Sequence, residues 1–274
     1  MLKKNLLQIF RRFSYLFGKV GLDNSWDMSD IFIVSYPKSG TTYLCLILAN
    51  ILKDLQKDPR RVDFYSVHDY VPDLHANPQR INQISPQRFI KTHESFEEWN
   101  SRISVKGRGV NYPRVIYLIR EGKKTMASSY MYARAMSVKP ISFSDFIMRE
   151  KSSRGAWDDH VNGWLLQDNG IDKKMVQIIK YEDLLENTLE VIKSLLEFSG
   201  LNVGEGAINK AIENSDIYKI RELESQFGNG VIYFDREYKF ARDGSKREIS
   251  ERVISEVNEY FENNGKEVLD QLGY

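Results

Sequence analysis

The sequence has almost no cysteine. Its one cysteine in 274 residues, Cys45, excludes a disulfide within the chain and any cysteine-rich zinc site, and it is typical of a protein from a reducing compartment. Apolar residues surround Cys45 on both sides, so we interpret its thiol as a core side chain rather than a nucleophile. We therefore expect a cytoplasmic protein that folds without disulfides.

The chain also lacks a long apolar run and a strong net charge. No stretch of about 18 apolar residues occurs, so no membrane-spanning helix is predicted. Lysine and arginine number 39 against 38 aspartate and glutamate residues, which gives a formal net charge of +1. Such a balance creates no field that gathers polyanions, so nucleic acid is disfavoured as the main partner and any anion site must be built locally.

Residues 1–25 form a basic amphipathic segment. Arg11 and Arg12 interrupt the apolar core that a secretion signal would need. The apolar stripe can pack on the rest of the protein, which we favour, or lie on an anionic membrane surface as a peripheral contact. The composition, 42% hydrophobic and 28% charged, suits one compact domain over residues 26–274.

Repeats and low-complexity tracts are absent, so the elements are read from changes in hydrophobic period. Short apolar runs predict buried strands at Ile31–Ser35, Arg88–Lys91, Arg114–Ile119 and Met175–Lys180. Helical patterns follow at 41–53, at 123–135 and between Asn187 and Gly200, the last with a capping-box-like start. The alternation predicts an α/β fold with a parallel central sheet flanked by helices on both faces. Ligands should then bind at the carboxyl ends of the strands, under irregular lids at 54–87 and 228–245.

The first predicted strand leads into the turn Ser35-Tyr36-Pro37-Lys38-Ser39-Gly40-Thr41-Thr42-Tyr43. Backbone N–H groups at the start of the next helix point outward, Gly40 permits a tight turn, and Lys38 adds positive charge. The P-loop of NTPases has the pattern G-x-x-x-x-G-K-[ST], whereas here the lysine comes two residues before the only glycine of the turn. The turn therefore predicts a phosphate-bearing ligand but not a Walker loop.

This turn resembles the 5'-phosphosulfate-binding loop of sulfotransferases that use 3'-phosphoadenylyl sulfate (PAPS). Those enzymes usually read YPKSGTTW where this chain reads YPKSGTTY. The similarity continues in order through Lys91-Thr92-His93, through the strand ending at Arg120 with Ser128 on the next helix, and through Tyr181-Glu182-Asp183-Leu184. It implies a P-loop nucleotide-kinase-like sulfotransferase fold. It also implies metal-independent, in-line transfer of a sulfuryl group from PAPS to a hydroxyl or amine, leaving adenosine 3',5'-bisphosphate.

The resemblance assigns catalytic roles to single residues. His93 corresponds to the general base that removes the acceptor's proton, and Glu94 is a fallback base. Lys38 and Lys91 correspond to lysines that stabilise the bridging oxygen and the sulfuryl group. The residues that would hold the 5'-phosphate are Ser39, Gly40, Thr41 and Thr42.

It also assigns the nucleotide pocket. Arg120 and Ser128 fit the family's 3'-phosphate site, since an arginine at a strand end can fork onto phosphate oxygens. Tyr181 matches a tyrosine that lines the nucleotide pocket. Tyr43 stands where a tryptophan is usual, so stacking on the adenine should be reduced on one side.

Departures from the family pattern increase toward the end of the chain. Ser215 and Ile217 occupy the positions of a Thr-x-Phe pair around the adenine. Arg242 and Gly244 match the family's Arg-Lys-Gly segment at the 3'-phosphate, but Asp243 replaces the lysine. The following Ser245-Lys246-Arg247 could supply the lost positive charge.

The sequence does not identify the acceptor, so a small metabolite, a glycolipid and a saccharide all stay open. Acceptor pockets are made from variable loops, here 65–75, 136–143 and 228–238. The aromatic residues of these loops that could line a pocket or simply pack are Tyr65, Tyr70, Phe143 and Tyr233.

Two alternatives to a sulfotransferase remain, and the oligomeric state is not indicated. One is a phospholigand-binding or peripheral membrane protein that keeps the fold without the chemistry. The other is a nucleotide-dependent kinase on a related sheet, which should need Mg²⁺ and a Walker lysine.

Overall fold

The computed structural model describes residues 28–75, 88–104, 112–228, 233, 238, 240 and 249–274. The predictions for the segment 1–25 and for Arg242, Asp243 and Gly244 fall outside these residues. No membrane-spanning candidate occurs among the helices built from the described part of the chain.

Four parallel strands form the central sheet, in the spatial order β2-β1-β3-β4. They are β1 (Ile31–Val34), β2 (Phe89–Thr92), β3 (Arg114–Ile119) and β4 (Val176–Lys180). The first three strands are largely buried, which explains why they read as continuous apolar runs rather than as alternating ones. The four predicted strands are confirmed, each within one residue at either end.

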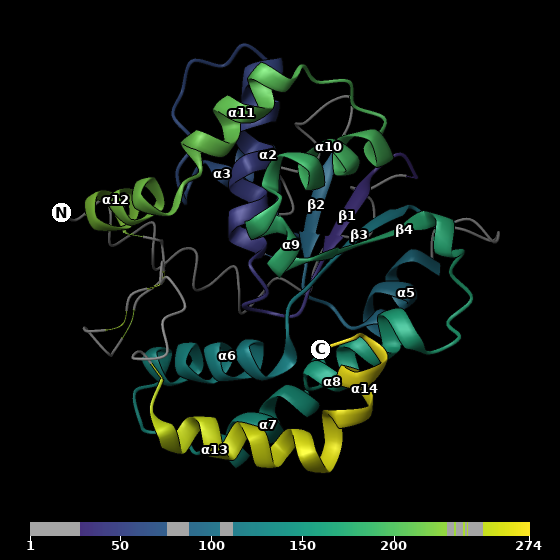
Figure 1. Cartoon of the computed structure of the whole chain (residues 1–274), viewed down its shortest axis with the longest axis vertical. Helices are drawn as coiled ribbons and strands as arrows, with labels where there is room; N and C mark the ends of the chain where they lie inside the picture. Colours follow the sequence, from purple (N-terminus) through teal and green to yellow (C-terminus); the bar gives the residue numbers. More distant parts are fainter. Residues whose placement is uncertain are drawn as a thin grey trace.

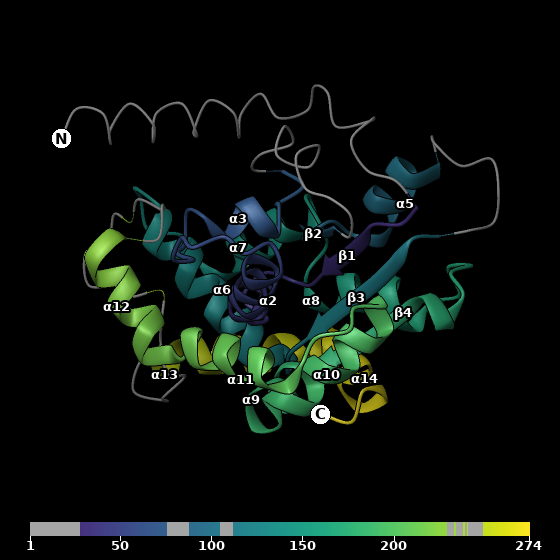
Figure 2. The ribbon, with the colours of Figure 1, turned by 90° about the horizontal axis from the view of Figure 1, so that it is seen from above.

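Helices cover both faces of the sheet, so the predicted fold class is confirmed (Figure 1). Side chains alternate along a strand, so Phe32 and Val34 enter one core while Ile31 and Ile33 enter the other. In chain order the helices and helical turns are α2 (Thr41–Leu55), α3 (Val67–Tyr70), α5 (Phe96–Ser104), α6 (Gly122–Met136), α7 (Phe143–Lys151), α8 (Trp157–Val161), the π-helical turn η1 (Asn162–Leu166), the 3₁₀ turn η2 (Lys173–Met175), α9 (Tyr181–Glu186), α10 (Thr188–Ser199), α11 (Glu205–Asn214), α12 (Ile217–Phe227), α13 (Glu251–Tyr260), the π-helical turn η4 (Phe261–Gly265) and α14 (Lys266–Gln271). Helix α12 lies at the end of the molecule away from β4 (Figure 2).

The strand order locates the crevice of the sheet. The chain passes from β1 to β2 on one side and then to β3 on the other side of β1, and such a reversal opens a crevice at the carboxyl ends of the strands. The residues that directly follow the four strands are Ser35, His93, Arg120 and Tyr181. Parallel strands end at the same edge, so every strand delivers one polar residue to this crevice.

The predicted helices are found with small changes at their ends, but the side-chain capping expected at Asn187 is not formed. Asn187 is the N-cap residue of α10, yet its side chain makes no capping hydrogen bond. Helix α9 ends only one residue earlier, and the Asn187 N–H still completes that helix by donating to the Asp183 carbonyl at 2.8 Å. Gly200 ends α10 in the left-handed region, as predicted.

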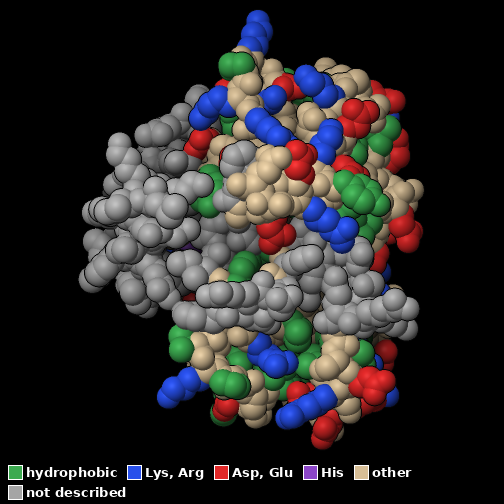
Figure 3. Space-filling view, turned by 90° about the vertical axis from the view of Figure 1, so that its left-hand side faces the viewer, with side chains coloured by type: hydrophobic (Ala, Val, Ile, Leu, Met, Phe, Trp, Pro, Cys, Tyr) green, Lys and Arg blue, Asp and Glu red, His purple; other side chains and the backbone are tan. Residues whose placement is uncertain are grey.

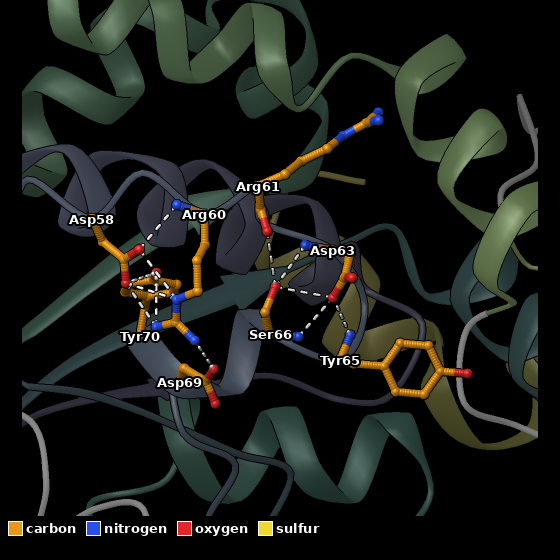
Figure 4. Close-up of polar contacts among 8 residues, drawn as sticks. All are labelled: Asp58, Arg60, Arg61, Asp63, Tyr65, Ser66, Asp69 and Tyr70. Carbon is orange, nitrogen blue, oxygen red and sulfur yellow. Dashed lines mark hydrogen bonds and ion pairs between the residues drawn. The ribbon is translucent and has the colours of Figure 1, made fainter. Parts of the chain in front are cut away.

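The segment expected to be irregular is ordered between residues 56 and 75. Figure 4 shows Arg60 donating to both carboxylate oxygens of Asp58, at 2.7–3.1 Å, and to Asp69 at 3.2 Å. Tyr70, only 1% exposed, donates its hydroxyl to Asp58 at 2.7 Å. Asp63 accepts the backbone N–H groups of residues 65 and 66 and so starts α3. Apart from the four residues of α3 and the bridge at Asp73, the backbone of this part has no regular secondary structure, as predicted, and its role as a lid stays a prediction.

Candidate functional site

The turn after β1 is tightly bent. Lys38 and Gly40 both take left-handed backbone angles, with φ of 72° and 94°. Glycine adopts this region readily, whereas a lysine there is strained, and such strain persists mainly where function needs the geometry. The Ser39 N–H donates to the Tyr36 carbonyl at 3.3 Å, and α2 begins at Thr41. The turn therefore presents the first backbone N–H groups of a long helix at the carboxyl edge of the sheet.

Tyr181 lies directly against this turn. It is the first residue of α9 and follows β4. A Cβ atom added at Gly40 would lie 2.2 Å from Cδ2 of the Tyr181 ring, so only glycine fits at position 40. The structure thus brings together two residues that the sequence assigned to the nucleotide site from positions far apart in the chain.

Arg120 joins the same group from the end of β3. Its Nη1 donates to the Lys38 carbonyl at 3.1 Å, and its guanidinium carbon lies 5.0 Å from the centroid of the Tyr181 ring. Two buried atoms here have no hydrogen-bond partner among the described residues, the Ser39 hydroxyl oxygen and Arg120 Nε. Buried donors are normally satisfied, so this pair fits an anionic ligand such as a phosphate.

The affinity of this turn for an anion has to come from charged groups close to it. On the face shown in Figure 3, basic and acidic side chains of the described residues are mixed rather than gathered by sign. Ser128 lies on α6, the helix after Arg120, and is 8% exposed, so it faces the protein interior. Its contact with a phosphate stays a prediction.

His93 is joined to the turn through Ser35. Its Nδ1 lies 2.7 Å from the Ser35 carbonyl oxygen and 3.2 Å from the Ser35 hydroxyl. A carbonyl only accepts, so Nδ1 carries the proton and Nε2 keeps its lone pair. The Ser35 hydroxyl also lies 2.5 Å from the Thr41 hydroxyl, while Thr42 follows in the first turn of α2.

The environment of His93 favours its neutral form. Burial lowers the pKa of the imidazole well below its usual range, and the positive charge of Lys91 lowers it further. The hydrogen bond to the Ser35 carbonyl opposes this shift without reversing it. A neutral imidazole with a free Nε2 can accept a proton near neutral pH.

The two lysines of the site have different partners. Lys91 Nζ donates to Asp73 Oδ2 at 2.6 Å, and both side chains are largely buried. The Lys38 ammonium lies 3.8 Å from the centroid of the Phe240 ring and 4.8 Å from that of Tyr132, as in a cation–π contact.

The residues assigned to the adenine end lie around the start and middle of α2. Tyr43 is half-buried in its first turn. Ser215 is fully buried, where its hydroxyl donates to the Ala211 carbonyl at 2.9 Å and accepts from Asn50 at 3.2 Å. Ile217 begins α12 and packs against the core. Ser215 therefore has a structural role in the fold, and its contact with adenine stays a prediction.

Several polar and aromatic candidates serve the fold instead. The Glu94 carboxylate pairs with Arg102 and lies 3.4 Å from His75, so the geometry does not support it as a fallback base. Tyr70 and Phe143 are buried in the two cores, at 1% and 7% exposure. Packing, the alternative noted for these aromatic residues, accounts for both.

The sequence reasoning missed three residues of the site. Asp73 lies in a segment predicted to be irregular, Ser35 is predicted only to end the first strand and begin the turn, and Tyr132 has a predicted place in a helix but no predicted role. Aspartate after proline gives no signal for a partner elsewhere in the chain. Among the described residues, no group of three or more histidine, cysteine, aspartate or glutamate side chains is placed to hold a metal ion.

Comparisons with known proteins agree on one family. Residues 28–273 match the sequence model described as "Sulfotransferase domain". Sulfotransferase 1E1 of Bos taurus is 28% identical over 217 residues, which are 72% of this chain and 67% of the relative. Sulfotransferase 2A2 of Rattus norvegicus is 25% identical over 225 residues, 76% of this chain and 74% of the relative.

Solved structures share the fold. The mouse sulfotransferase SULT7A1 complexed with PAP matches with a TM-score of 0.59 at 20% identity, over 90% of this chain and 89% of that one. A retinol dehydratase in complex with androsterone and PAP matches with a TM-score of 0.59 at 19% identity, over 92% of this chain and 85% of that one. The predicted sulfotransferase fold is thereby confirmed.

Proposed function

Because this chain belongs to the sulfotransferase domain family, whose members transfer a sulfuryl group from PAPS, we propose that the carboxyl edge of its sheet transfers this group to a small-molecule acceptor. The observation that carries the proposal is the position of Ser35. Its hydroxyl lies 2.5 Å from Thr41 in the anion-binding turn, and its carbonyl lies 2.7 Å from His93. A proton acceptor and an anion site that share one residue are close enough to serve a single transfer.

The donor site follows from the same edge. Residues 39–42 hold the 5'-phosphate with backbone N–H groups and hydroxyls, while Arg120 and Ser128 hold the 3'-phosphate. Tyr181 and Tyr43 line the nucleotide pocket. The two unpartnered donors, on Ser39 and Arg120, support this assignment.

The remaining proposed contacts with PAPS rest on the family resemblance. Ser215 and Ile217 lie at the adenine end, and Arg242 and Gly244 complete the 3'-phosphate site. The last two lie outside the described residues.

PAPS supplies the activated sulfuryl group. His93 takes the acceptor's proton at Nε2 while the acceptor oxygen or nitrogen bonds to sulfur. The bond from sulfur to the bridging phosphate oxygen breaks in the same step, its electrons stay on that oxygen, and Lys38 stabilises the charge. Lys91 contacts the sulfuryl oxygens, so positioning and electrostatics supply most of the rate.

The acceptor is proposed to carry an apolar or aromatic group. Tyr132 lies beside Lys38 and is in ring contact with Tyr233, Tyr238 and Phe240, with centroid separations of 6.0, 6.1 and 6.4 Å. Such a wall suits a phenol, a hydrophobic alcohol or the apolar part of a glycolipid better than a purely polar saccharide. The retinol dehydratase structure is in complex with androsterone, which is an apolar molecule of this kind.

Transfer from labelled donor to a panel of acceptors tests the proposed activity. We expect the full chain, incubated with ³⁵S-labelled PAPS, to label hydrophobic alcohols, phenols or amines, and chelation of divalent metal by EDTA to leave the rate unchanged. Binding of PAPS without labelling of any acceptor would favour a phospholigand-binding protein on the same fold. Phosphate transfer from ATP with Mg²⁺ would favour the kinase.

Replacing Arg120 by alanine should chiefly weaken donor binding. A charge-assisted hydrogen bond contributes about 1.5–3 kcal/mol, so the Kd for adenosine 3',5'-bisphosphate should rise about 10- to 150-fold. Isothermal titration calorimetry measures this change. Arg114→Ala is the matched control, since Arg114 begins the same strand and donates to the Phe198 carbonyl at 2.7 Å, remote from the crevice. Equal weakening by both variants would contradict the assignment of Arg120.

A further inference from the structure

We propose that Asp73 is a positioning residue for the transfer, which fixes the Lys91 ammonium against the reacting sulfuryl group. This inference rests on the proposed function and adds to it a residue that the sequence motifs do not contain. It is carried by the backbone pairing of residues 72–74, by the ion pair itself, and by the groups that surround the pair.

Residues 72–74 add a short parallel segment to the free edge of the sheet. The Lys91 N–H donates to the Pro72 carbonyl at 2.9 Å, and the Leu74 N–H donates to the Lys91 carbonyl at 2.9 Å. Asp73 and Lys91 are therefore paired residues of a parallel bridge. Paired residues project from the same face of a sheet, so the backbone itself delivers the carboxylate to the lysine.

The pairing segment is anchored on both of its sides. Val71 and Leu74 are each 0% exposed, and they enter the two different cores of the protein. The segment therefore cannot shift without exposing apolar surface on both faces of the sheet. Asp73 is held in place by this packing and not only by its own contacts.

Both carboxylate oxygens of Asp73 are engaged. Oδ1 accepts the His75 N–H at 3.0 Å, and Oδ2 accepts from Lys91 Nζ at 2.6 Å. The two side chains are 15% and 16% exposed. An ammonium has three N–H donors, so Asp73 takes one and orients the other two, which are left for the sulfuryl oxygens.

The pair also sets the charges at the site. Burial acts to lower the pKa of Lys91, but Asp73 raises it and the net pKa lies above the usual value; Cys45 and Tyr132, which face the lysine from α2 and α6, act in the same direction as Asp73. Burial acts to raise the pKa of the Asp73 carboxyl, but Lys91, joined by His68 of α3 and His93 when these are protonated, holds it well below the usual range. Lys91 is thus charged and His93 neutral under the same conditions.

The substitution Asp73→Asn tests this role. It removes the charge while keeping the size of the side chain. We expect kcat to fall about 10- to 100-fold, with the Kd for adenosine 3',5'-bisphosphate changed by less than about threefold. The alkaline limb of the pH–rate profile should move to lower pH, since Lys91 loses the group that raises its pKa. In a Lys91→Met background, Asp73→Asn should have almost no further effect, because Asp73 acts through Lys91.

The chain offers a matched control in Asp30→Asn. Asp30 is 1% exposed and pairs with Arg88 at 2.6 Å, where β1 and β2 begin, at the opposite end of β2 from the crevice. The control should lose stability, measured by thermal unfolding, without moving the alkaline limb. If Asp73→Asn does not fold, Asp73→Ser is measured in its place. Serine also removes the charge, and its hydroxyl oxygen can accept a hydrogen bond from Lys91, so no two donors face each other.

Different outcomes separate this proposal from the proposed function. A wild-type chain that transfers no sulfuryl group contradicts the function, whereas an active wild type with a fully active Asp73 variant contradicts the role of Asp73 alone. Additive losses in the Lys91→Met background also overturn it. Titration of the ¹³C-labelled Lys91 side chain by NMR decides independently of any acceptor, since the lysine pKa must fall in the Asp73 variant and stay unchanged in the Asp30 variant.

Discussion

Replacement of His93 by alanine is expected to reduce sulfuryl transfer about 10²- to 10⁴-fold, the usual contribution of a general base. The reason is the orientation of the ring. The Ser35 carbonyl, 2.7 Å from Nδ1, fixes the proton on that nitrogen and leaves Nε2 to accept the acceptor's proton. The loss should appear in kcat, measured with labelled PAPS at saturating acceptor.

The pH dependence checks the same residue. Burial and then the Lys91 charge hold the pKa of His93 well below its usual value. The active form is the neutral imidazole, so a lowered pKa keeps the enzyme active further into the acid range. The acid limb of kcat/KM should therefore lie well below pH 6.5, the ordinary histidine value. An acid limb at the ordinary histidine pKa would argue against His93 as the base.

Two controls accompany the His93 variant. Binding of adenosine 3',5'-bisphosphate should be nearly unchanged, because the imidazole is assigned no contact with the nucleotide. The neighbouring substitution Glu94→Gln should keep most of the transfer activity while lowering stability, since the Glu94 carboxylate pairs with Arg102. Wild-type turnover by His93→Ala, or a collapse of turnover only in Glu94→Gln, would move the base to another residue.

Gly40→Ala should disable the donor site and destabilise the protein. Alanine pays about 1–2 kcal/mol for the left-handed backbone, and its Cβ would lie 2.2 Å from the Tyr181 ring. Overpacking of this kind costs about 1–3 kcal/mol more. The turn or the ring must move, so adenosine 3',5'-bisphosphate should bind at least about tenfold more weakly by calorimetry.

Gly170→Ala separates the two causes of this loss. Gly170 also has a positive φ, 76°, but a Cβ there would meet nothing within 4 Å. Its alanine variant should lose only the backbone contribution and bind the nucleotide normally. A second change, Tyr181→Ala in the Gly40→Ala chain, should restore part of the stability and little of the binding. Identical behaviour of the two glycine variants would refute the steric explanation.

The features that could be predicted from the sequence are local ones. Apolar runs of four to six residues are enough to indicate the strands β1 and β3, and turn residues such as Pro37 and Gly40 mark where the first strand ends. Parallel strands end at one edge, so the gathering of His93 and Arg120 near the turn followed from the order of elements alone. The family resemblance added the roles of these residues.

The features that could not be predicted depend on contacts between distant parts of the chain. Nothing near Asp73 in the sequence indicates that it pairs with Lys91, because the pairing needs residues 72–74 to lie beside β2. Tyr70 and Phe143 have the composition of pocket residues, and only tertiary packing decides that they are buried. Asn187 carries a capping signal that the preceding helix makes unnecessary.

The single cysteine of the chain can report local unfolding of helix α2 next to the proposed nucleotide site. Cys45 lies in α2, one turn after Thr41 and Thr42 of the proposed anion-binding turn, where it is 2% exposed and burial raises its pKa to about 12. A covered, protonated sulfur does not react with alkylating reagents, so each modification would record a transient detachment of this helix. Occupancy by a nucleotide would slow that chemistry, and mass spectrometry could then follow ligand binding through a single adduct, without any engineered label.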